Sequence, residues 1–323
     1  MKVAIIDDYQ DAVRTLNCFA KLQGHEVTVF NDPQSDPAVI AARLQGFDAV
    51  LLTQQRTRFG KSIIEKLPQL KLISQTGAHT AHIDVAACTA QGIVVSAGGG
   101  AMANATAELT WGLIISAVRH LPYEVAQLRA GHWQTTLGTG LRGKTLGIYA
   151  YGRIGSIVAG VGRAFGMNVV CLGRGASMEK ARAAGFATAE SRESFFANAD
   201  VLSLRLPLNA HTRGIVTAAD LALMKPTALL VNTSRAPLIE ESALATALEK
   251  GRPGFAAVDV FEDEPVLKAA HPLLNTDKAL CTPHLGYVVR ENYESYYGTA
   301  IDHIVAYAKG SPINVANPEA LKK

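Results

Sequence analysis

Short apolar segments alternate with helical patterns along almost the whole chain, and this alternation restricts the possible folds more than any other feature. The apolar runs have the length of buried strands, and the segments between them carry apolar residues at helical spacing. Alternation of this kind predicts parallel sheets buried on both faces. The first predicted strands are 3–7, 27–30, 49–53, 70–74 and 93–96, and the helices between them are 11–23, 37–45, 60–67 and 82–91.

A second set of strands and helices follows a glycine run at 98–100. Between the two sets, the sequence predicts a long apolar helix from about Ala103 to Leu121, which Pro122 ends. The strands of the second set are predicted at 145–150, 168–172, 201–206, 228–232, 256–260 and 279–283, and a last helix at 290–309. The fold class is therefore α/β, with two parallel sheets.

Composition and charge exclude several classes of protein. The 323 residues are 48% hydrophobic and carry a formal net charge of +3 without a dense basic run, so we expect neither a nucleic-acid nor a membrane partner. The amino-terminal run MKVAIIDDYQ stops at two aspartates and is typical of a core strand, not of a signal peptide. No CxxC pair occurs, so we expect no disulfide framework and no metal site, and we expect reduced thiols in a cytoplasm. The cysteines are Cys18, Cys88, Cys171 and Cys281.

The segment LGIYAYGRIG at 146–155 is a strand, a turn and the start of a helix. Gly152 and Gly155 occupy the second and third positions of a dinucleotide-binding glycine motif, and Ala150 occupies the first. The methyl group of Ala150 is tolerated there if the turn keeps a negative φ. The helix N-terminus would offer free N–H groups to a pyrophosphate. Taken alone, the motif fits either a phosphate site or an ordinary packing corner.

The end of the next strand, CLGRGAS, bears on the choice of cofactor. Gly173 stands where an acid usually holds the ribose hydroxyls of NAD, and Arg174 follows it. A guanidinium can bind a 2′-phosphate through paired donors, so we expect a preference for NADPH over NADH. The alternative is a solvated arginine in a glycine loop.

Three further segments each end a predicted strand of the second set: 231–241, 256–265 and 281–288. Because ligands of open α/β sheets bind at the carboxyl ends of strands, their polar residues are expected to converge. Singly, each has an ordinary interpretation as a surface arginine, an exposed acid or a buried histidine. Together they favour a site formed by Arg235, Asp259, Glu264 and His284.

The chain resembles the D-isomer-specific 2-hydroxyacid dehydrogenase family over nearly its whole length. LRGKTLGIYAYGRIG resembles the family's cofactor motif, and VNTSRAPLIEE, DVFEDEP and TPHLG resemble its catalytic blocks in order and spacing. TGAHTAHIDVAACTAQGI resembles its substrate loop, and AELTWGLIISAVR its interdomain helix. With this context, we interpret the glycine corner as a nucleotide site.

The resemblance implies two Rossmann-like domains with an interdomain cleft. The substrate-binding domain, flavodoxin-like, would comprise 1–101 and 290–323, and the NAD(P)-binding domain 102–289, with hinge closure between them. Helix 103–121 and segment 131–143 would form a homodimer contact, and packing within one chain is the alternative.

The resemblance also implies the chemistry, which is reduction of a small 2-oxo acid such as glyoxylate or hydroxypyruvate. Arg235 would bind the substrate carboxylate, and His284 would protonate the ketone oxygen as hydride reaches carbon 2. Glu264 would favour the charged imidazole, so reduction should fade at alkaline pH.

Further positions are assigned by the same resemblance. The cofactor-binding residues would be Tyr151, Gly152, Arg153, Ile154, Gly155, Gly173, Arg174, Leu206, Pro207, Thr212, Thr233, Ser234, Asp259 and Gly286. The substrate-binding residues would be Gln54, Gly77, Ala78 and His79. The chain departs from the family pattern at Gln54 (often arginine), His79 (often glycine), Met102 (often asparagine), Arg205 (often histidine) and Tyr287 (usually small). The ordinary interpretation of Arg205 is surface variation.

Two other functions fit the same fold. One is a corepressor-like protein that senses NAD(P)(H), although no basic patch supports it. The other is a formate- or phosphite-type dehydrogenase, which the arginine and the histidine do not exclude. Turnover of a panel of 2-oxo acids separates these functions from the reductase.

Overall fold

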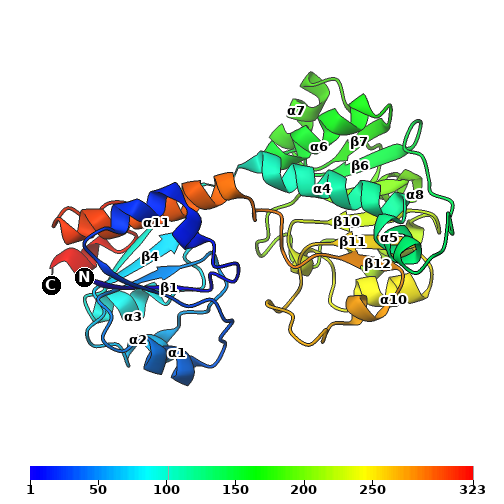
Figure 1. Ribbon diagram of the computed structural model, residues 1–323. Helices are drawn as coiled ribbons and strands as arrows, with labels where there is room; N and C mark the ends of the chain where they lie inside the picture. Colours follow the sequence, from blue (N-terminus) through cyan, green and yellow to red (C-terminus); the bar gives the residue numbers. More distant parts are fainter. Residues whose placement is uncertain (101, 323) are drawn as a thin grey trace. The chain divides into compact units, whose positions relative to one another are not determined.

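The computed structural model describes residues 1–100 and 102–322, and it divides into two compact units (Figure 1). The first unit comprises Met1–Met102 and Val288–Lys323, and the second comprises Ala103–Tyr287. The predicted domain boundary at residue 101 lies outside the described residues. Within the described ranges, no helix has both the length and the apolar character needed to cross a bilayer.

The first unit is built on a five-stranded parallel sheet in the order β2-β1-β3-β4-β5. Helices α1 to α3 cover one face, and α11 lies against the other (Figure 1). Strand order and parallel pairing follow the flavodoxin-like arrangement, as expected. The bounds are β1 Lys2–Ile6, β2 Glu26–Val29, α1 Pro37–Arg43, β3 Ala49–Leu52, α2 Lys61–Ile64, β4 Leu72–Thr76, α3 Val85–Ala90, β5 Val94–Gly98, α11 Arg290–Ala308 and the 3₁₀ helix η5 Pro318–Lys322.

The helix predicted at 11–23 is wrong in type. Two 3₁₀ helices, η1 (Val13–Thr15) and η2 (Asn17–Leu22), occupy this segment, and Leu16 between them is extended. Side-chain carboxylates take the N–H groups that an α-helix would leave free at each start. Asp8 accepts hydrogen bonds from the N–H groups of residues 12 and 13, and Glu294 accepts those of residues 17 and 18.

The second unit is built on a seven-stranded parallel sheet in the order β12-β11-β10-β9-β6-β7-β8. The chain reverses its direction of travel across the sheet between β6 and β9, which is the position where open α/β sheets bind nucleotides. The bounds are α4 Ala103–Val118, α5 Leu121–Arg129, β6 Thr145–Tyr149, α6 Arg153–Ala164, β7 Asn168–Leu172, α7 Ala176–Ala183, β8 Ala187–Thr188, α8 Arg192–Asn198, β9 Val201–Leu204, α9 Ala218–Leu223, β10 Leu229–Asn232, η3 Ala236–Leu238, α10 Ala243–Glu249, β11 Phe255–Val258, η4 Pro272–Asn275 and β12 Ala279–Cys281.

The helix expected to run to Leu121 ends earlier, and Pro122 does not end it. Helix α4 ends at Val118, and His120 takes a left-handed conformation with φ 51°. Pro122 then lies in the first turn of α5. Proline is tolerated there because the N–H that it lacks would have no partner inside the helix.

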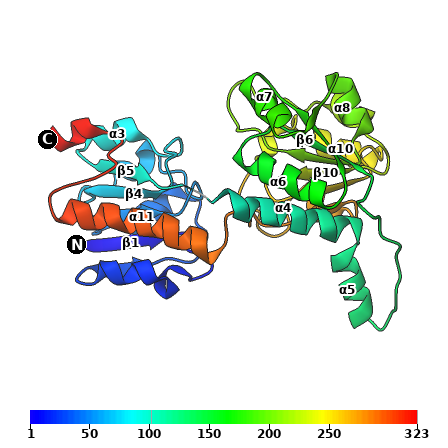
Figure 2. The same ribbon diagram turned by 90° about the horizontal axis from the view of Figure 1, so that it is seen from above.

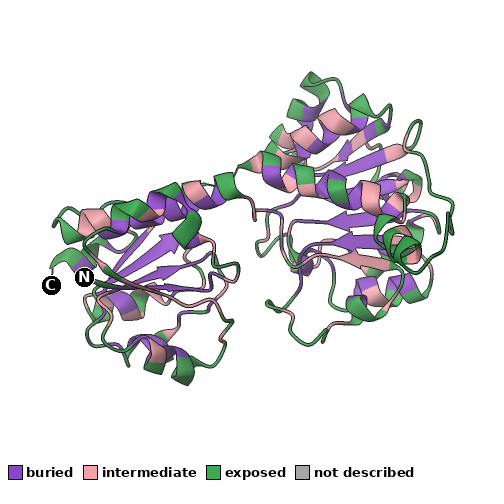
Figure 3. Cartoon of the chain, viewed as in Figure 1, coloured by how far each residue is buried: buried purple, intermediate pink, exposed green. Residues whose placement is uncertain are grey.

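Successive residues of β6 face two separate cores. Tyr149 packs with Phe195 and Phe196 on the face covered by α8, α9 and α10, whereas Ile148 packs with Trp111 on the face covered by α4, α6 and α7. The central strands of both sheets are buried (Figure 3). Burial on both faces explains why these strands are continuous apolar runs in the sequence.

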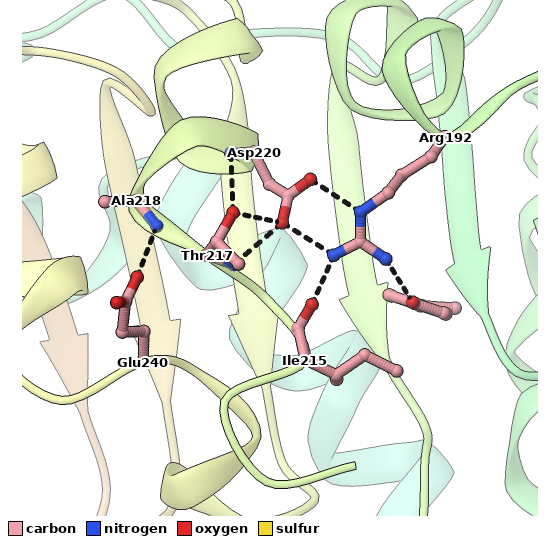
Figure 4. A network of polar contacts seen from close by, with 7 residues as sticks. Arg192, Ile215, Thr217, Ala218, Asp220 and Glu240 are labelled. Atoms are coloured by element: carbon pink, nitrogen blue, oxygen red, sulfur yellow. Dashed lines mark hydrogen bonds and ion pairs between the residues drawn. The ribbon is translucent and has the colours of Figure 1, made fainter. Parts of the chain in front are cut away.

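A polar network connects α8, α9 and the loop after β9 (Figure 4). The guanidinium of Arg192 donates two hydrogen bonds to the carboxylate of Asp220, at 2.7 and 2.6 Å, and others to the Ile215 carbonyl and the Tyr149 hydroxyl. Asp220 also accepts the backbone N–H and the hydroxyl of Thr217, which caps α9. Burial raises the pKa of Asp220, but these hydrogen bonds outweigh it, so the pKa lies below its ordinary value of 3.8.

We expect Asp220→Asn to lower the free energy of unfolding by about 1–3 kcal/mol, because it leaves the Arg192 guanidinium without its charge partner. The folded-state pKa is depressed, so the contribution of this carboxylate is present at neutral pH and is lost as pH falls below 3.8. Urea denaturation at pH 7 and at pH 3 should therefore show a smaller difference between variant and wild type at pH 3. The control is Glu65→Gln, which removes the exposed pair with Lys61 and should change stability by less than about 0.5 kcal/mol. Equal losses in both variants would contradict the assignment.

Candidate active site

The turn between β6 and α6 has the geometry of a phosphate-binding corner. Gly152 is the N-cap of α6, and in the described chain no side chain caps this helix, so its first N–H groups are free. A Cβ atom at Gly155 would lie 2.5 Å from the Ala150 carbonyl oxygen, so the helix can approach the strand only with glycine there. A Cβ at Gly152 would have no described atom within 4 Å. The open space and the free donors fit a cofactor pyrophosphate.

Ala150 departs from the conformation expected of it. The sequence interpretation required a negative φ, but φ is +78°. The backbone is held there because the Ala150 N–H donates to the Leu172 carbonyl at 2.7 Å. An alanine in the left-handed region is strained by about 1 kcal/mol or more.

The end of β7 lies beside this corner. The Ser177 hydroxyl contacts both the N–H and the carbonyl of Tyr151, at 3.0 and 3.2 Å. Arg174 is exposed, and a Cβ at Gly173 would meet the flexible end of Met178 at 2.9 Å. Position 173 therefore accepts a larger side chain if Met178 moves.

His284 and Glu264 form a close pair, with 2.6 Å between Nδ1 and Oε2. The other carboxylate oxygen of Glu264 accepts the Phe261 N–H at 2.9 Å. Burial raises the pKa of Glu264, but the contact with His284, the Phe261 N–H and the charge of Arg235 outweigh it, so its pKa lies below the ordinary value. Glu264 is therefore ionised at neutral pH and available to accept a hydrogen bond from the imidazole ring.

Asp259 fixes the turn that carries His284. Its carboxylate accepts the Thr282 hydroxyl at 2.6 Å and the N–H groups of Leu285 and Gly286 at 2.7 and 2.8 Å. His284 itself has φ 52°, a left-handed conformation that this turn imposes. Burial raises the pKa of Asp259 and the three hydrogen bonds oppose it. The sequence interpretation gave Asp259 a cofactor contact and missed this positioning role.

The loop after β10 presents Arg235 to solvent. Its guanidinium donates to the Ser234 carbonyl at 2.7 Å, and it is exposed. The Ser234 hydroxyl donates to the Leu206 carbonyl at 2.7 Å, and Asn232 bonds both the Ser234 N–H and the Arg235 carbonyl. These contacts fix the loop while the arginine fork remains available to a carboxylate.

The loop after β9 closes on itself through Thr212. The Thr212 hydroxyl donates to the Pro207 carbonyl at 2.6 Å and accepts the Asn209 N–H at 2.8 Å. Thr212 therefore supports the Leu206–Pro207 segment from within.

Arg205 is not a surface residue, so that interpretation was wrong. Its exposed fraction is 9%. Within residues 1–100 and 102–322, the guanidinium bonds only hydroxyl groups, those of Thr110, Ser203 and Thr233, at 2.5–2.9 Å. Thr110 lies on α4, and one turn earlier Thr106 donates to the Gly286 carbonyl at 2.8 Å. The sequence interpretation missed both threonines, although their spacing of four residues places them on one helix face.

In the first unit, the segment assigned to the substrate lies where β3 and β4 end. Gln54 has φ 54°, and its N–H donates to the Thr76 hydroxyl at 2.6 Å. The Gly77 N–H donates to the Gly98 carbonyl, and Ala78 and His79 are exposed. Gln54 and Gly77 are neighbours, since a Cβ at Gly77 would lie 3.9 Å from the Gln54 amide nitrogen.

Behind this loop, His82 contacts the Gln75 amide oxygen at 3.1 Å, and the amide nitrogen of Gln75 donates to the Gln54 carbonyl. Burial, with a smaller effect of His79, lowers the pKa of His82 to about 4. His82 is therefore neutral at physiological pH and supports the loop without a charge.

Comparison with known proteins gives consistent results. The model of the D-isomer specific 2-hydroxyacid dehydrogenase, NAD binding domain, matches residues 111–286. A glyoxylate reductase from Aeropyrum pernix is 36% identical over 309 residues, covering 92% of this chain and 91% of that protein. A D-3-phosphoglycerate dehydrogenase from Methanocaldococcus jannaschii is 38% identical over 244 residues, 75% of this chain and 46% of that protein. A crystal structure of a phosphoglycerate oxidoreductase from Vibrio cholerae has a TM-score of 0.92 at 49% identity, and covers 96% of this chain and 99% of that one.

Proposed function

Because this chain belongs to the D-isomer-specific 2-hydroxyacid dehydrogenase family, we propose that it reduces a small 2-oxo acid with NADPH. Members of this family are NAD-dependent oxidoreductases that act on CH–OH groups. The observation that supports the reaction best is the 2.6 Å contact between His284 and Glu264, on a turn that Asp259 holds in place.

The roles of the residues follow from their chemistry. Arg235 binds the substrate carboxylate through its exposed fork and polarises the adjacent ketone. A reduced nicotinamide, when bound, would supply the hydride for carbon 2. His284 donates its proton to the ketone oxygen, which completes the 2-hydroxy acid, and Glu264 holds the imidazole through Nδ1 so that Nε2 faces the substrate.

The substrate class we propose is a 2-oxo acid with one carboxylate and no phosphate, similar to glyoxylate or hydroxypyruvate. A neutral side chain, Gln54, stands where several family members have arginine, so this position offers no cation to a second anionic group. His79 makes the loop bulkier than glycine would, which favours a short side chain on the substrate.

We expect His284→Gln to lower kcat for reduction by about 10²–10⁴, because the proton donor is removed while its shape is kept. The measurement is NADPH oxidation at 340 nm with glyoxylate, hydroxypyruvate, pyruvate and phenylpyruvate. Tight cofactor binding without turnover of any 2-oxo acid would instead favour the sensing protein. Turnover of formate or phosphite, without turnover of any 2-oxo acid, would favour a formate- or phosphite-type dehydrogenase.

The pH dependence follows from the Glu264–His284 pair. The pKa of Glu264 is depressed, so its charge persists as pH falls and is lost only below the ordinary value of 4.5. The Glu264 carboxylate should therefore hold the imidazole from pH 5 upward, and reduction should decline as pH falls below 4.5. Glu264→Gln should lower kcat and abolish this acidic decline, because the amide that replaces the carboxylate does not titrate. An unchanged profile of kcat against pH in this variant would rule out the proposed role.

Our proposal that NADPH is preferred depends on Gly173 and Arg174. An exposed guanidinium and the absence of an acid at the end of β7 favour a 2′-phosphate. We expect Gly173→Asp to reduce the ratio of kcat/KM for NADPH over NADH by about tenfold or more, and Arg174→Gln to reduce it through a higher KM for NADPH. Exposed Arg163, on the far end of α6, supplies the control Arg163→Gln, which should leave the ratio unchanged. A wild-type enzyme that uses NADH better would overturn the preference.

We further propose a homodimer, on an apolar surface formed by α5 and segment 131–139. Helix α5 projects from the body of the second unit (Figure 2), and its described residues include none that is buried. Trp133 and Leu137 have exposed fractions of 76% and 96%. In contrast, Trp111 and Ile114 of α4 pack inside the unit, so we assign the contact to α5 rather than α4.

The double variant Trp133→Ser with Leu137→Ser should shift the protein from dimer to monomer in light scattering after size exclusion. Losing two large apolar side chains from a contact weakens association by about tenfold or more each. Leu267→Ser, an exposed leucine on another loop, is the control and should remain dimeric. A monomeric wild type would refute the proposal.

A further inference from the structure

Arg205 is a buried cation that forms no ion pair within the described part of the chain, although the charge of Asp259 acts on it. Among the described residues, no carboxylate forms an ion pair with its guanidinium, and all four of its hydrogen bonds go to hydroxyls. Burial, opposed by the charge of Asp259, lowers the pKa of Arg205 to about 9, so the side chain remains charged at neutral pH. A buried charge held this way acts on its surroundings with little screening by solvent.

Because each hydroxyl has only one proton, the direction of these hydrogen bonds can be assigned. The Thr110 hydroxyl donates its one proton to the Thr106 carbonyl at 2.7 Å, so it can only accept from Arg205 and from Thr233. The Thr233 hydroxyl therefore donates to Thr110 and accepts from Arg205. The network orients dipoles around the guanidinium but supplies no negative charge to cancel it.

Arg205 lies at the end of the sheet where a nicotinamide would bind. It follows β9, next to the reversal between β6 and β9, and it bonds Thr233 at the end of β10. The 2′-phosphate determinants Gly173 and Arg174 follow β7, on the other side of that reversal. A dinucleotide that crosses the reversal with its adenosine at β7 has its nicotinamide over β9, β10 and β11.

We propose that Arg205 biases the cofactor site toward binding the reduced nicotinamide rather than the oxidised form, and so toward release of the oxidised product. The proposal rests on the cofactor site proposed above. The reduced ring is neutral, and loss of hydride leaves a ring with a positive charge. A fixed cation at this end of the sheet would disfavour that charged product, whereas Asp259 alone would favour it. Arg205 offsets Asp259, and oxidised cofactor is released more readily after hydride transfer.

The test is a comparison of cofactor binding by wild type, Arg205→Gln and Arg205→Lys, using fluorescence titration with the oxidised and reduced forms of whichever cofactor binds. In Arg205→Gln, the ratio of the Kd for the oxidised form to the Kd for the reduced form should fall by about tenfold. That change corresponds to a decrease of about 30 mV in the midpoint potential of the bound cofactor. Arg205→Lys keeps the charge and should retain the wild-type ratio to within about threefold.

The alternatives give different results. A structural role alone would weaken binding of both forms by the same factor in Arg205→Gln, and this outcome would overturn the proposal. The proposal would also be overturned if the Kd ratio fell as far in Arg205→Lys as in Arg205→Gln. If Arg205→Gln does not fold, Arg205→His at pH 8 supplies the neutral side chain. Failure of the wild type to bind either cofactor would refute the proposed function itself. This result is distinct from an unchanged ratio of the Kd values in Arg205→Gln, which would overturn only the role of Arg205.

Discussion

The candidate site depends on the hydrogen bonds that the carboxylate of Asp259 accepts. It accepts hydrogen bonds from one hydroxyl and two backbone N–H groups of the 282–286 turn. These contacts hold His284 at a positive φ, and the same turn meets α4 through Thr106. Without this acceptor the turn would have buried N–H groups without partners, so the position of the histidine follows from satisfying the backbone. The short contact to Glu264 then follows from that position.

The strands of both sheets could be predicted because burial on both faces makes them continuous apolar runs. What local patterns could not predict is where side chains from distant segments compete for backbone N–H groups. Glu294, far along the chain, accepts N–H groups at the start of η2 and helps to divide the predicted helix at 11–23. Likewise, Pro122 indicated the end of a helix, but whether proline ends one helix or begins the next depends on the left-handed His120 before it. The two-residue strand β8 is too short to give an apolar run.

In the candidate site too, the sequence predicts some residues correctly and others not. Motif spacing was enough to identify His284 and Glu264 as neighbours, since each follows a strand of one parallel sheet and both strands end at the same edge. Arg205 could not be interpreted correctly, because an arginine after a strand is usually exposed. Its burial depends on three hydroxyls contributed by α4, β9 and the end of β10, and no one segment reveals that combination.

Strained backbone occurs at matching positions in the two units. Ala150, His284 and Gln54 each follow a strand, and each has a positive φ without being glycine. At such positions the chain must turn sharply at a strand end and still direct a side chain or an N–H group toward that edge of the sheet. Tertiary contacts stabilise this conformation, which the local sequence does not favour. Ala150 is held by the Leu172 carbonyl, His284 by Asp259, and Gln54 by Thr76. Strain at these residues is therefore maintained by hydrogen bonds to a neighbouring strand or its following loop. Within each unit, the edge of the sheet therefore fixes these residues more than the loops themselves do.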